Sequence, residues 1–204
     1  MTAARRDVVV RGFHPSDLPA MYDVCLRTGD SGRDATPLYD DRHLLGHVYC
    51  GPYPVADPGL TFVAVDELGV AGYVVATADA RAFSTWRRSV WYPRLRDAYP
   101  RGSRRPGLES DRIAEIWSDT DPGGDVLDAY PAELHIDLLP RLQGRGVGRA
   151  LTERLWSALR ARGVPGVHLG VGSGNPGARA FYLAMGYTEH AVHDWGSTMV
   201  KDLR

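Results

Sequence analysis

A strand, a glycine-rich turn and a helix follow one another directly between Glu133 and Arg162, and this succession constrains the fold more than any other stretch. Residues 133–138 alternate polar and apolar side chains, which is the period of a β-strand. Pro140 ends that pattern, and glycines at 144, 146 and 148 space the turn that follows. Leu151, Leu155 and Leu159 then recur at helical spacing. The stretch therefore predicts a strand, a glycine loop and a helix, as in an α/β protein.

A glycine loop that opens a helix suits an anion. Glycines allow tight turns and close backbone approach, and the first N–H groups of a helix point outward at the positive end of its dipole. A P-loop is excluded because the loop has no Gly-Lys-Ser/Thr. A dinucleotide fingerprint is excluded because Arg149 stands where its third glycine should be, and the next strand, Val167 to Val171, ends without an acidic residue. The cradle suits the pyrophosphate of some other ligand.

Gln143, Gly146 and Gly148 fit the pattern Gln/Arg-x-x-Gly-x-Gly/Ala at the end of a strand. Here the chain resembles the GNAT superfamily of N-acetyltransferases, in which this loop holds the pyrophosphate of acetyl-CoA. Residues 175–187, NPGARAFYLAMGY, resemble the second GNAT signature, in which the Asn meets the pantetheine arm and the Tyr lies near the thioester sulfur. The two signatures occur in the right order and at the right spacing.

The resemblance implies a GNAT fold, an α/β (α+β) fold whose central mixed, mostly antiparallel sheet of about six or seven strands is flanked by helices. It implies acetyl-CoA as cosubstrate. The residues it implies for binding acetyl-CoA are Leu138, Leu139, Gln143, Gly144, Arg145, Gly146, Val147, Gly148, Arg149, Asn175 and Tyr182.

The pattern along the chain predicts one GNAT domain over residues 1–204, with an insertion at about 79–130 between the third and fourth strands. Strands are predicted at Val8–Val10, Leu60–Val65, Val70–Ala76, Val167–Val171, Tyr187–Val192 and Ser197–Lys201, and helices after Pro15 and from about Pro176 to Met185. Thr28 to Pro58, rich in Asp, Gly and Pro, reads as a loop region with a short helix at Asp41–Val48.

The insertion interleaves aromatic residues with arginines, a composition that can bind nucleic acid. We favour an amphipathic helix that buries Phe83, Trp86, Val90 and Trp91 and leaves its arginines in solvent, because the acidic stretch at 109–128 offsets their charge. The net charge of -1 likewise predicts no nucleic-acid or membrane partner.

The two cysteines, Cys25 and Cys50, make no disulfide framework, and no segment reaches membrane-spanning length, so a soluble, cytoplasmic protein is expected. His43 and His47 lie four residues apart, but without a HExxH glutamate or a third ligand they predict a surface or capping role and no metal.

Transfer of acetyl to an amine needs a base for the amine and an acid for the leaving thiolate. The family match makes Tyr182 the acid. Ionisable groups on one face of a central strand need a cleft or partners, so Asp137 is the first candidate for the base, followed by Glu133 and His135. A structural role for Asp137, paired with an arginine of the insertion, stays open. Asp30 and Asp34 are candidates for binding the acceptor ammonium.

The chain also resembles the acetyltransferase-like C-terminal domain of animal O-GlcNAcase, on the stretches AMYDVCLRTGD at 20–30, LTFVAVDELGVAGYVVATADARA at 60–82, and Trp91-Tyr92-Pro93. This resemblance spans most of the chain and implies a bacterial-type, stand-alone relative. Two functions follow: an acetyl-CoA-dependent N-acetyltransferase acting on a primary amine by direct attack in a ternary complex, or a non-catalytic acyl-CoA-binding or interaction module. The acceptor, a small molecule or a peptide lysine, and the choice between monomer and homodimer are left open.

Overall fold

The structure is a computed structural model that describes residues 7–102, 107–118 and 123–204. Its centre is a sheet, formed within the described residues by seven strands in the order β1-β2-β3-β4-β5-β7-β6. The strands are β1 (Val9–Gly12), β2 (Thr61–Asp66), β3 (Gly69–Thr77), β4 (Ala132–Leu138), β5 (Gly166–Gly172), β6 (Thr188–His193) and β7 (Gly196–Asp202). The β4–β5 pair is parallel and the other neighbours are antiparallel. The expected mixed, mostly antiparallel sheet is confirmed.

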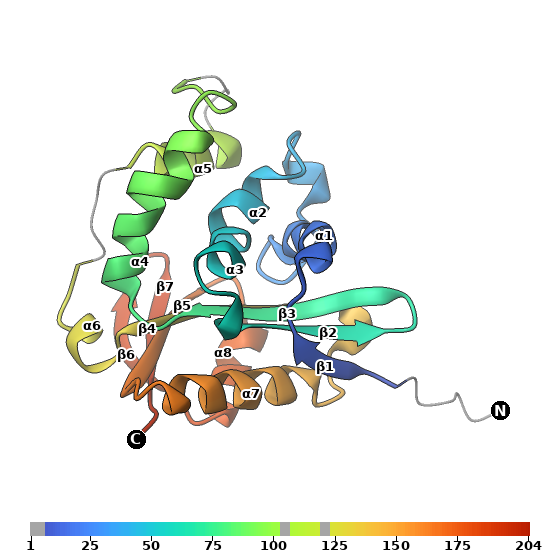
Figure 1. The fold of residues 1–204 in the computed structure, drawn as a ribbon, viewed down its shortest axis with the longest axis vertical. Coiled ribbons are helices and arrows are strands. Elements are labelled where there is room, and N and C mark those ends of the chain that lie inside the picture. The colour runs from blue at the N-terminus through green and yellow to red at the C-terminus, as the bar shows by residue number, and fades with distance from the viewer. Residues whose placement is uncertain (1–6, 103–106, 119–122) are drawn as a thin grey trace.

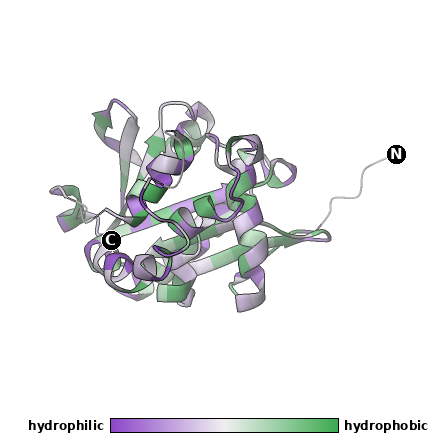
Figure 2. Ribbon diagram, turned by 90° about the horizontal axis from the view of Figure 1, so that it is seen from above, coloured by the Kyte–Doolittle hydropathy of each residue, from purple (hydrophilic) through white to green (hydrophobic). Residues whose placement is uncertain are grey.

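Helices cover both faces of the sheet. They are α1 (Leu18–Thr28), α2 (Leu44–Tyr49), α3 (Pro52–Ala56), α4 (Ala80–Trp86), α5 (Leu108–Ile116), α6 (Val126–Ala129), α7 (Val147–Ala161) and α8 (Pro176–Ala184). In Figure 1, α7 and α8 lie below the sheet and α1 to α3 above it, with α4 and α5 rising beside them. Figure 2 shows hydrophobic stretches along the central strands, whereas the surrounding helices carry both kinds of residue. Among the described helices, none is long and apolar enough to cross a membrane.

The hydrophobic periodicity of α7 explains its place under the sheet. Leu151, Leu155 and Leu159 are fully buried, and the helix packs against β2, β3 and β4. A helix with one apolar stripe gains most of its stability from burying that stripe. α7 therefore fixes the position of the glycine loop that precedes it.

The region from Thr28 to Pro58 holds more helix than the sequence predicts. Besides α2, the short α3 starts at Pro52, and its Tyr53 is 1% exposed. Proline is favoured at the first position of a helix, and five-residue helices form only through tertiary packing. Composition alone therefore made this segment look like a loop.

The insertion between β3 and β4 differs from the expected helix in two respects. α4 continues through a wider π-type turn at residues 87–91, and Phe83 is buried as expected, whereas Trp86, Val90 and Trp91 are only half-buried. Arg87, however, turns inward, and its guanidinium lies 4.9 Å from the ring centre of Phe83 and 5.8 Å from that of Tyr92. The expectation that the arginines of this helix lie in solvent is thus wrong for Arg87, because the aromatic faces attract the cation.

Candidate active site

β4 and β5 separate soon after they begin, and a cleft lies where they part. Within the described residues their pairing is confined to Ala132 with Val167 and Glu133 with His168. The last three residues of β4, Ile136 to Leu138, line a cleft of about 640 Å³. That volume suits a small-molecule ligand. The parting of the two strands therefore opens the sheet at the carboxyl end of β4.

The glycine loop forms one wall of this cleft. Gly144 and Gly146 have φ angles of 68° and 79°, in the left-handed region that favours glycine, and both line the cleft. The first bond of the α7 ladder runs from the Ala150 N–H to the Gly146 carbonyl, so the N–H groups of residues 147–149 precede the ladder. Gly146 has no neighbour within 4 Å of the position a Cβ would take, as judged from the described residues. The loop thus presents open backbone donors, the arrangement that a pyrophosphate requires.

The charges around this helix start also favour an anion. No acidic residue lies in the first turn of α7, whereas Arg145 and Arg149 flank it. Cations at the positive end of a helix dipole are unfavourable by about 0.3–1 kcal/mol. Such a cost is offset when an anion binds between them. The residues present therefore fit the pyrophosphate of a CoA thioester.

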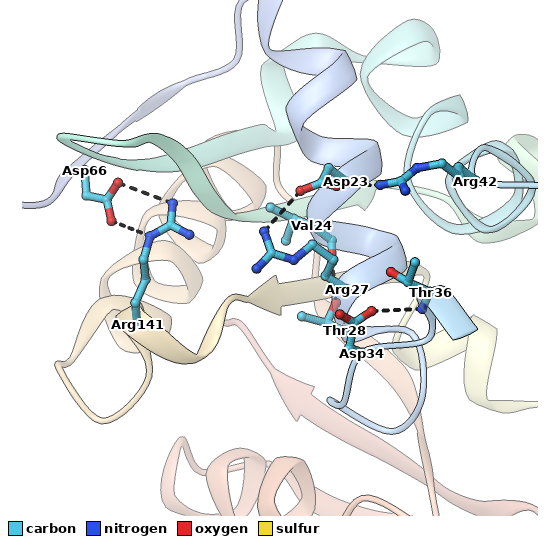
Figure 3. A network of polar contacts seen from close by, with 9 residues as sticks. All are labelled: Asp23, Val24, Arg27, Thr28, Asp34, Thr36, Arg42, Asp66 and Arg141. Carbon is cyan, nitrogen blue, oxygen red and sulfur yellow. Dashed lines mark hydrogen bonds and ion pairs between the residues drawn. The ribbon is translucent and has the colours of Figure 1, made fainter. Parts of the chain in front are cut away.

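An ion pair ties the glycine loop to the β2–β3 hairpin. Arg141, in the short turn after β4, donates through Nε to Asp66 Oδ2 at 2.7 Å (Figure 3). The Asp66 side chain is 2% exposed and that of Arg141 30%. Asp66 Oδ1 also accepts the Leu68 N–H at 2.9 Å, so this carboxylate joins the turn after β4 to the tip of the β2–β3 hairpin.

The opposite wall of the cleft comes from α8. Asn175 precedes the helix, and its side-chain oxygen accepts the Ala178 N–H at 3.0 Å, a cap that fixes the helix start. Phe181 and Tyr182 line the cleft with Ala178 and Met185. This wall is mostly apolar, with the polar Asn175 at its start.

A loop after α1 closes the cleft from above. Ser31, with a φ of 53°, Gly32 and Arg33 all line it, and a Cβ on Gly32 would meet the Asn175 amide nitrogen at 3.5 Å. Asp30 pairs with Arg33, and Asp34 accepts the Thr36 N–H (Figure 3). Neither acid lines the cleft, so the structure does not bring the two expected acceptor carboxylates to it.

The polar face of β4 divides into two ends. Asp137 lines the cleft and accepts a hydrogen bond from the Tyr73 hydroxyl, whereas Glu133 accepts one from Tyr53 at 3.3 Å and does not line the cleft. The two acids are four positions apart on β4, which corresponds to about 13 Å along the strand. His135, between them, packs against the rings of Tyr49 and Tyr53. Only Asp137 of the two expected acids therefore meets the cleft, and among the described residues it bonds to a tyrosine and not to an arginine of the insertion.

Burial sets the protonation of the two candidate catalytic groups. It raises the pKa of Asp137, an effect that the Tyr73 hydrogen bond, His135 and Thr28 oppose. It also raises the pKa of Tyr182, and the charges of Tyr187 and Asp137 add to this rise. Tyr182 therefore keeps its proton at neutral pH. A carboxyl group and a protonated phenol that line one cleft can serve as base and acid respectively.

The other residues predicted to bind acetyl-CoA lie in or next to the glycine loop, and some of them line the cleft. Gln143, Gly148 and Arg149 line the cleft with Leu138, and the Gln143 amide donates to the Leu138 carbonyl at 2.8 Å. Leu139 is 2% exposed and Val147 7%, so both support the loop from inside. Arg145 donates to the Arg141 carbonyl at 3.3 Å.

His43 and His47 have different surroundings in the structure. His43 is exposed at the start of α2 without a side-chain cap bond, whereas His47 turns inward to the Tyr22 hydroxyl at 2.9 Å. In the described part of the chain, no group of three His, Cys, Asp or Glu side chains is placed to hold a metal ion.

Sequence reasoning did not identify Tyr73, Thr28 or Phe181 as neighbours of the site. Tyr73 stands in an apolar strand, and only the β3–β4 register, which pairs it with Asp137, reveals its role. A hydroxyl in an otherwise apolar buried strand is the one available signal.

The chain is similar to known acetyltransferases in sequence and in structure. The profile of the Acetyltransferase (GNAT) family matches residues 110–187. The crystal structure of SsHAT is 38% identical, with a TM-score of 0.91 over 97% of this chain and 99% of that one. The structure of yncA, a putative acetyltransferase from Salmonella typhimurium with its cofactor acetyl-CoA, is 18% identical, with a TM-score of 0.55 over 97% of this chain and 95% of that one, and shares the fold.

Two curated relatives match different extents of the chain. Mycothiol acetyltransferase of Beutenbergia cavernae is 49% identical over 69 residues, which are 33% of this chain and 23% of the relative. Protein O-GlcNAcase of Rattus norvegicus is 24% identical over 200 residues, which are 94% of this chain and 21% of the relative. The chain thus spans about a fifth of the length of these relatives. Together with the sheet, the glycine loop and the full-length likeness to SsHAT, these matches show that the chain belongs to the GNAT superfamily of acetyltransferases.

Proposed function

We propose that this protein is an acetyl-CoA-dependent N-acetyltransferase that acts on a primary amine by direct attack in a ternary complex. The observation that carries the proposal is that Asp137 and Tyr182 face one cleft, whose wall also holds the open N–H groups at the start of α7. An anion site, an apolar arm site, a base and an acid therefore converge.

The residues divide the binding of acetyl-CoA between them. The loop from Gln143 to Arg149 would hold the pyrophosphate, and the α8 wall at Asn175 and Phe181 would hold the pantetheine arm. The bound thioester supplies the acetyl group. Tyr182, in the middle of the apolar wall, is then the side chain assigned to the sulfur.

The chain's own groups move two protons. Asp137 takes a proton from the acceptor ammonium, directly or through water, so that the nitrogen lone pair can attack the thioester carbonyl. The new C–N bond forms as the C–S bond breaks, and Tyr182 gives its proton to the departing sulfur. The amide nitrogen releases a second proton, which returns the phenolate of Tyr182 to its acid form.

Two features support this division of roles. The raised pKa of Asp137 brings it closer to that of an amine and makes it a stronger base than an exposed carboxylate. The charge of Asp137 in turn helps to hold the proton on Tyr182. Glu133, bonded to Tyr53 outside the cleft, is the second candidate for the base.

The alternative is a non-catalytic acyl-CoA-binding module. It is favoured by the similarity to O-GlcNAcase over 94% of this chain, because that relative is not named for acetyl transfer. Both functions use the same pyrophosphate cradle, so binding alone does not separate them.

Release of CoASH separates the two functions. The protein is incubated with acetyl-CoA and a panel of small amines, amino sugars, aminoglycosides and lysine peptides, and free thiol is measured against Tyr182→Phe and Asp137→Asn as matched controls. Acceptor-dependent release that both variants lose supports the enzyme. Acetyl-CoA binding by calorimetry without release across the panel refutes it in favour of the module.

A further inference from the structure

We propose that Tyr73 is a positioning residue: its hydroxyl holds one oxygen of Asp137, so that the carboxylate stays ionised and directs its other oxygen at the acceptor. The catalytic meaning of this inference rests on the proposed function. The Tyr73 hydroxyl lies 2.5 Å from Asp137 Oδ2, and Asp137 lines the cleft whereas Tyr73 does not. Tyr73 therefore reaches the site only through Asp137.

The β3–β4 register explains why this contact forms. Tyr73 and Asp137 are directly opposite one another on antiparallel strands, so their side chains leave the same face of the sheet. Tyr73 is 0% exposed, among apolar neighbours of β3. A buried hydroxyl is costly unless it is hydrogen-bonded, and phenylalanine would fill the same space without that cost. The Tyr73 hydroxyl donates to Asp137, and the thiols of Cys25 and Cys50 also lie within its reach.

Asp137 has no cation to hold its charge, as far as the described residues show. No lysine or arginine among them forms an ion pair with it. Thr28, beside it on α1, directs its hydroxyl to the Val24 carbonyl at 2.8 Å (Figure 3). Thr28 lowers the pKa of Asp137 less than Tyr73 does, so the Tyr73 hydroxyl is the strongest hydrogen-bond donor to this carboxylate.

The other titratable groups that face Asp137 are neutral at working pH. Burial raises the pKa values of Cys25 on α1 and Cys50 after α2, and of Tyr182 on α8. Burial also lowers the pKa of His135 on β4. Burial raises the pKa of Asp137, and the hydrogen bond from Tyr73 lowers it. Removal of the Tyr73 hydroxyl should therefore raise the pKa of Asp137, which then keeps its proton to a higher pH.

A second tyrosine–carboxylate pair on the same strand gives a matched control. Tyr53 is 1% exposed, and its hydroxyl donates to Glu133 Oε2 at 3.3 Å. Tyr53→Phe, on α3, therefore makes the same chemical change at similar burial, and it acts on a carboxylate four positions from Asp137 along β4. It also distinguishes the two candidate bases, because it changes the environment of Glu133 and not that of Asp137.

The test is a carboxyl ¹³C NMR titration of Asp137 in the ligand-free protein, with the resonance assigned by its loss in Asp137→Asn. Tyr73→Phe should raise the pKa of Asp137 by about one to two pH units, the value of a hydrogen bond to a charged group. The acid limb of kcat/KM should move up by a similar amount, and Tyr53→Phe should move neither. An unmoved Asp137 titration in folded Tyr73→Phe overturns the proposal, as does an acid limb that follows Tyr53→Phe instead.

A second change keeps the proposal testable should Tyr73→Phe fail to fold. 3-Fluorotyrosine inserted at position 73 alone keeps the shape and makes the phenol a stronger donor, so the pKa of Asp137 should fall; an unchanged or higher value refutes the contact. The titration needs no turnover. If the wild type releases no CoASH with any amine, the proposed function fails while the titration still decides the role of Tyr73.

Discussion

Gly146→Ala tests whether the glycine loop is the pyrophosphate cradle. The substitution strains the backbone at this position, but the new methyl group meets no other described part of the protein. Gly146 has a φ of 79°, and no described atom lies within 4 Å of a Cβ placed on it. An alanine in the left-handed region destabilises the folded state by about 1–2 kcal/mol. Alanine also lowers the conformational entropy of the unfolded chain, which offsets about 0.4–1 kcal/mol of that cost. The free energy of unfolding should therefore fall by about 1 kcal/mol.

Gly163→Ala is the matched control at the other end of the same helix. Gly163 has a φ of 71°, likewise has no described neighbour within 4 Å of a Cβ, and lies outside the cleft. The two variants should lose about equal stability. A new methyl group in the cradle, however, should remove one or two charge-assisted hydrogen bonds worth about 1.5–3 kcal/mol each, which weakens acetyl-CoA binding at least about tenfold.

Calorimetric titration with acetyl-CoA and urea unfolding measure the two quantities separately. The expected result is a weaker Kd in Gly146→Ala alone, with similar unfolding midpoints for both variants. Wild-type affinity in both variants would refute the assignment of this loop to the pyrophosphate. Equally weakened affinity in both would refute it too and would show that strain in α7 is transmitted to the cleft.

Three further predictions follow from the site. Tyr182→Phe should leave acetyl-CoA affinity within a few-fold and lower kcat by about 10²–10⁴, as measured by calorimetry and CoASH release; near-normal turnover would make Tyr182 structural. Asp137→Asn should raise Tm at pH 7, because a carboxyl whose folded pKa is raised destabilises the fold above that pKa; the gain should vanish as the pH falls below about 4, and a gain that persists there would contradict this cause. Arg141→Ala should lower the free energy of unfolding in urea by more than Arg149→Ala, because the Asp66 side chain that Arg141 pairs with is 2% exposed, whereas Arg149→Ala breaks an exposed pair with Glu153 and should cost less than about 1 kcal/mol; equal costs would show that the Asp66 pair does not hold the loop.

The sequence predicts the parts of the fold that rest on local periodicity. The alternation at 133–138 and the leucine spacing of α7 were sufficient, because each pattern matches one kind of element. The short α3 was missed, since its stability comes from the burial of Tyr53 and not from its own residues. Arg87 was placed wrongly, because its attraction to Phe83 depends on a tertiary contact.

The site shows the same division between local and long-range information. The loop geometry at Gly144 and Gly146 follows from glycine itself, and Tyr182 was found through a family signature. The sequence does not show which end of β4 meets the cleft, because the alternation treats Glu133 and Asp137 alike. Only the point where β4 leaves β5 separates them, and that point depends on the packing of the whole sheet.

The brief pairing of β4 with β5 has a consequence for how the protein unfolds. Among the described strands, the half-sheet β1–β4 and the half-sheet β5–β7 share one short seam at Ala132–Val167 and Glu133–His168. Few hydrogen bonds cross this seam, so amide exchange should report two foldons of different stability in the ligand-free protein. A ligand in the cleft would contact the end of β4 and the helix α8, which lies between β5 and β6 in the chain, and would stabilise only the joined state. In the ligand-bound protein, the amides of the two half-sheets should then exchange with similar protection. The ligand would link two halves that few backbone hydrogen bonds connect.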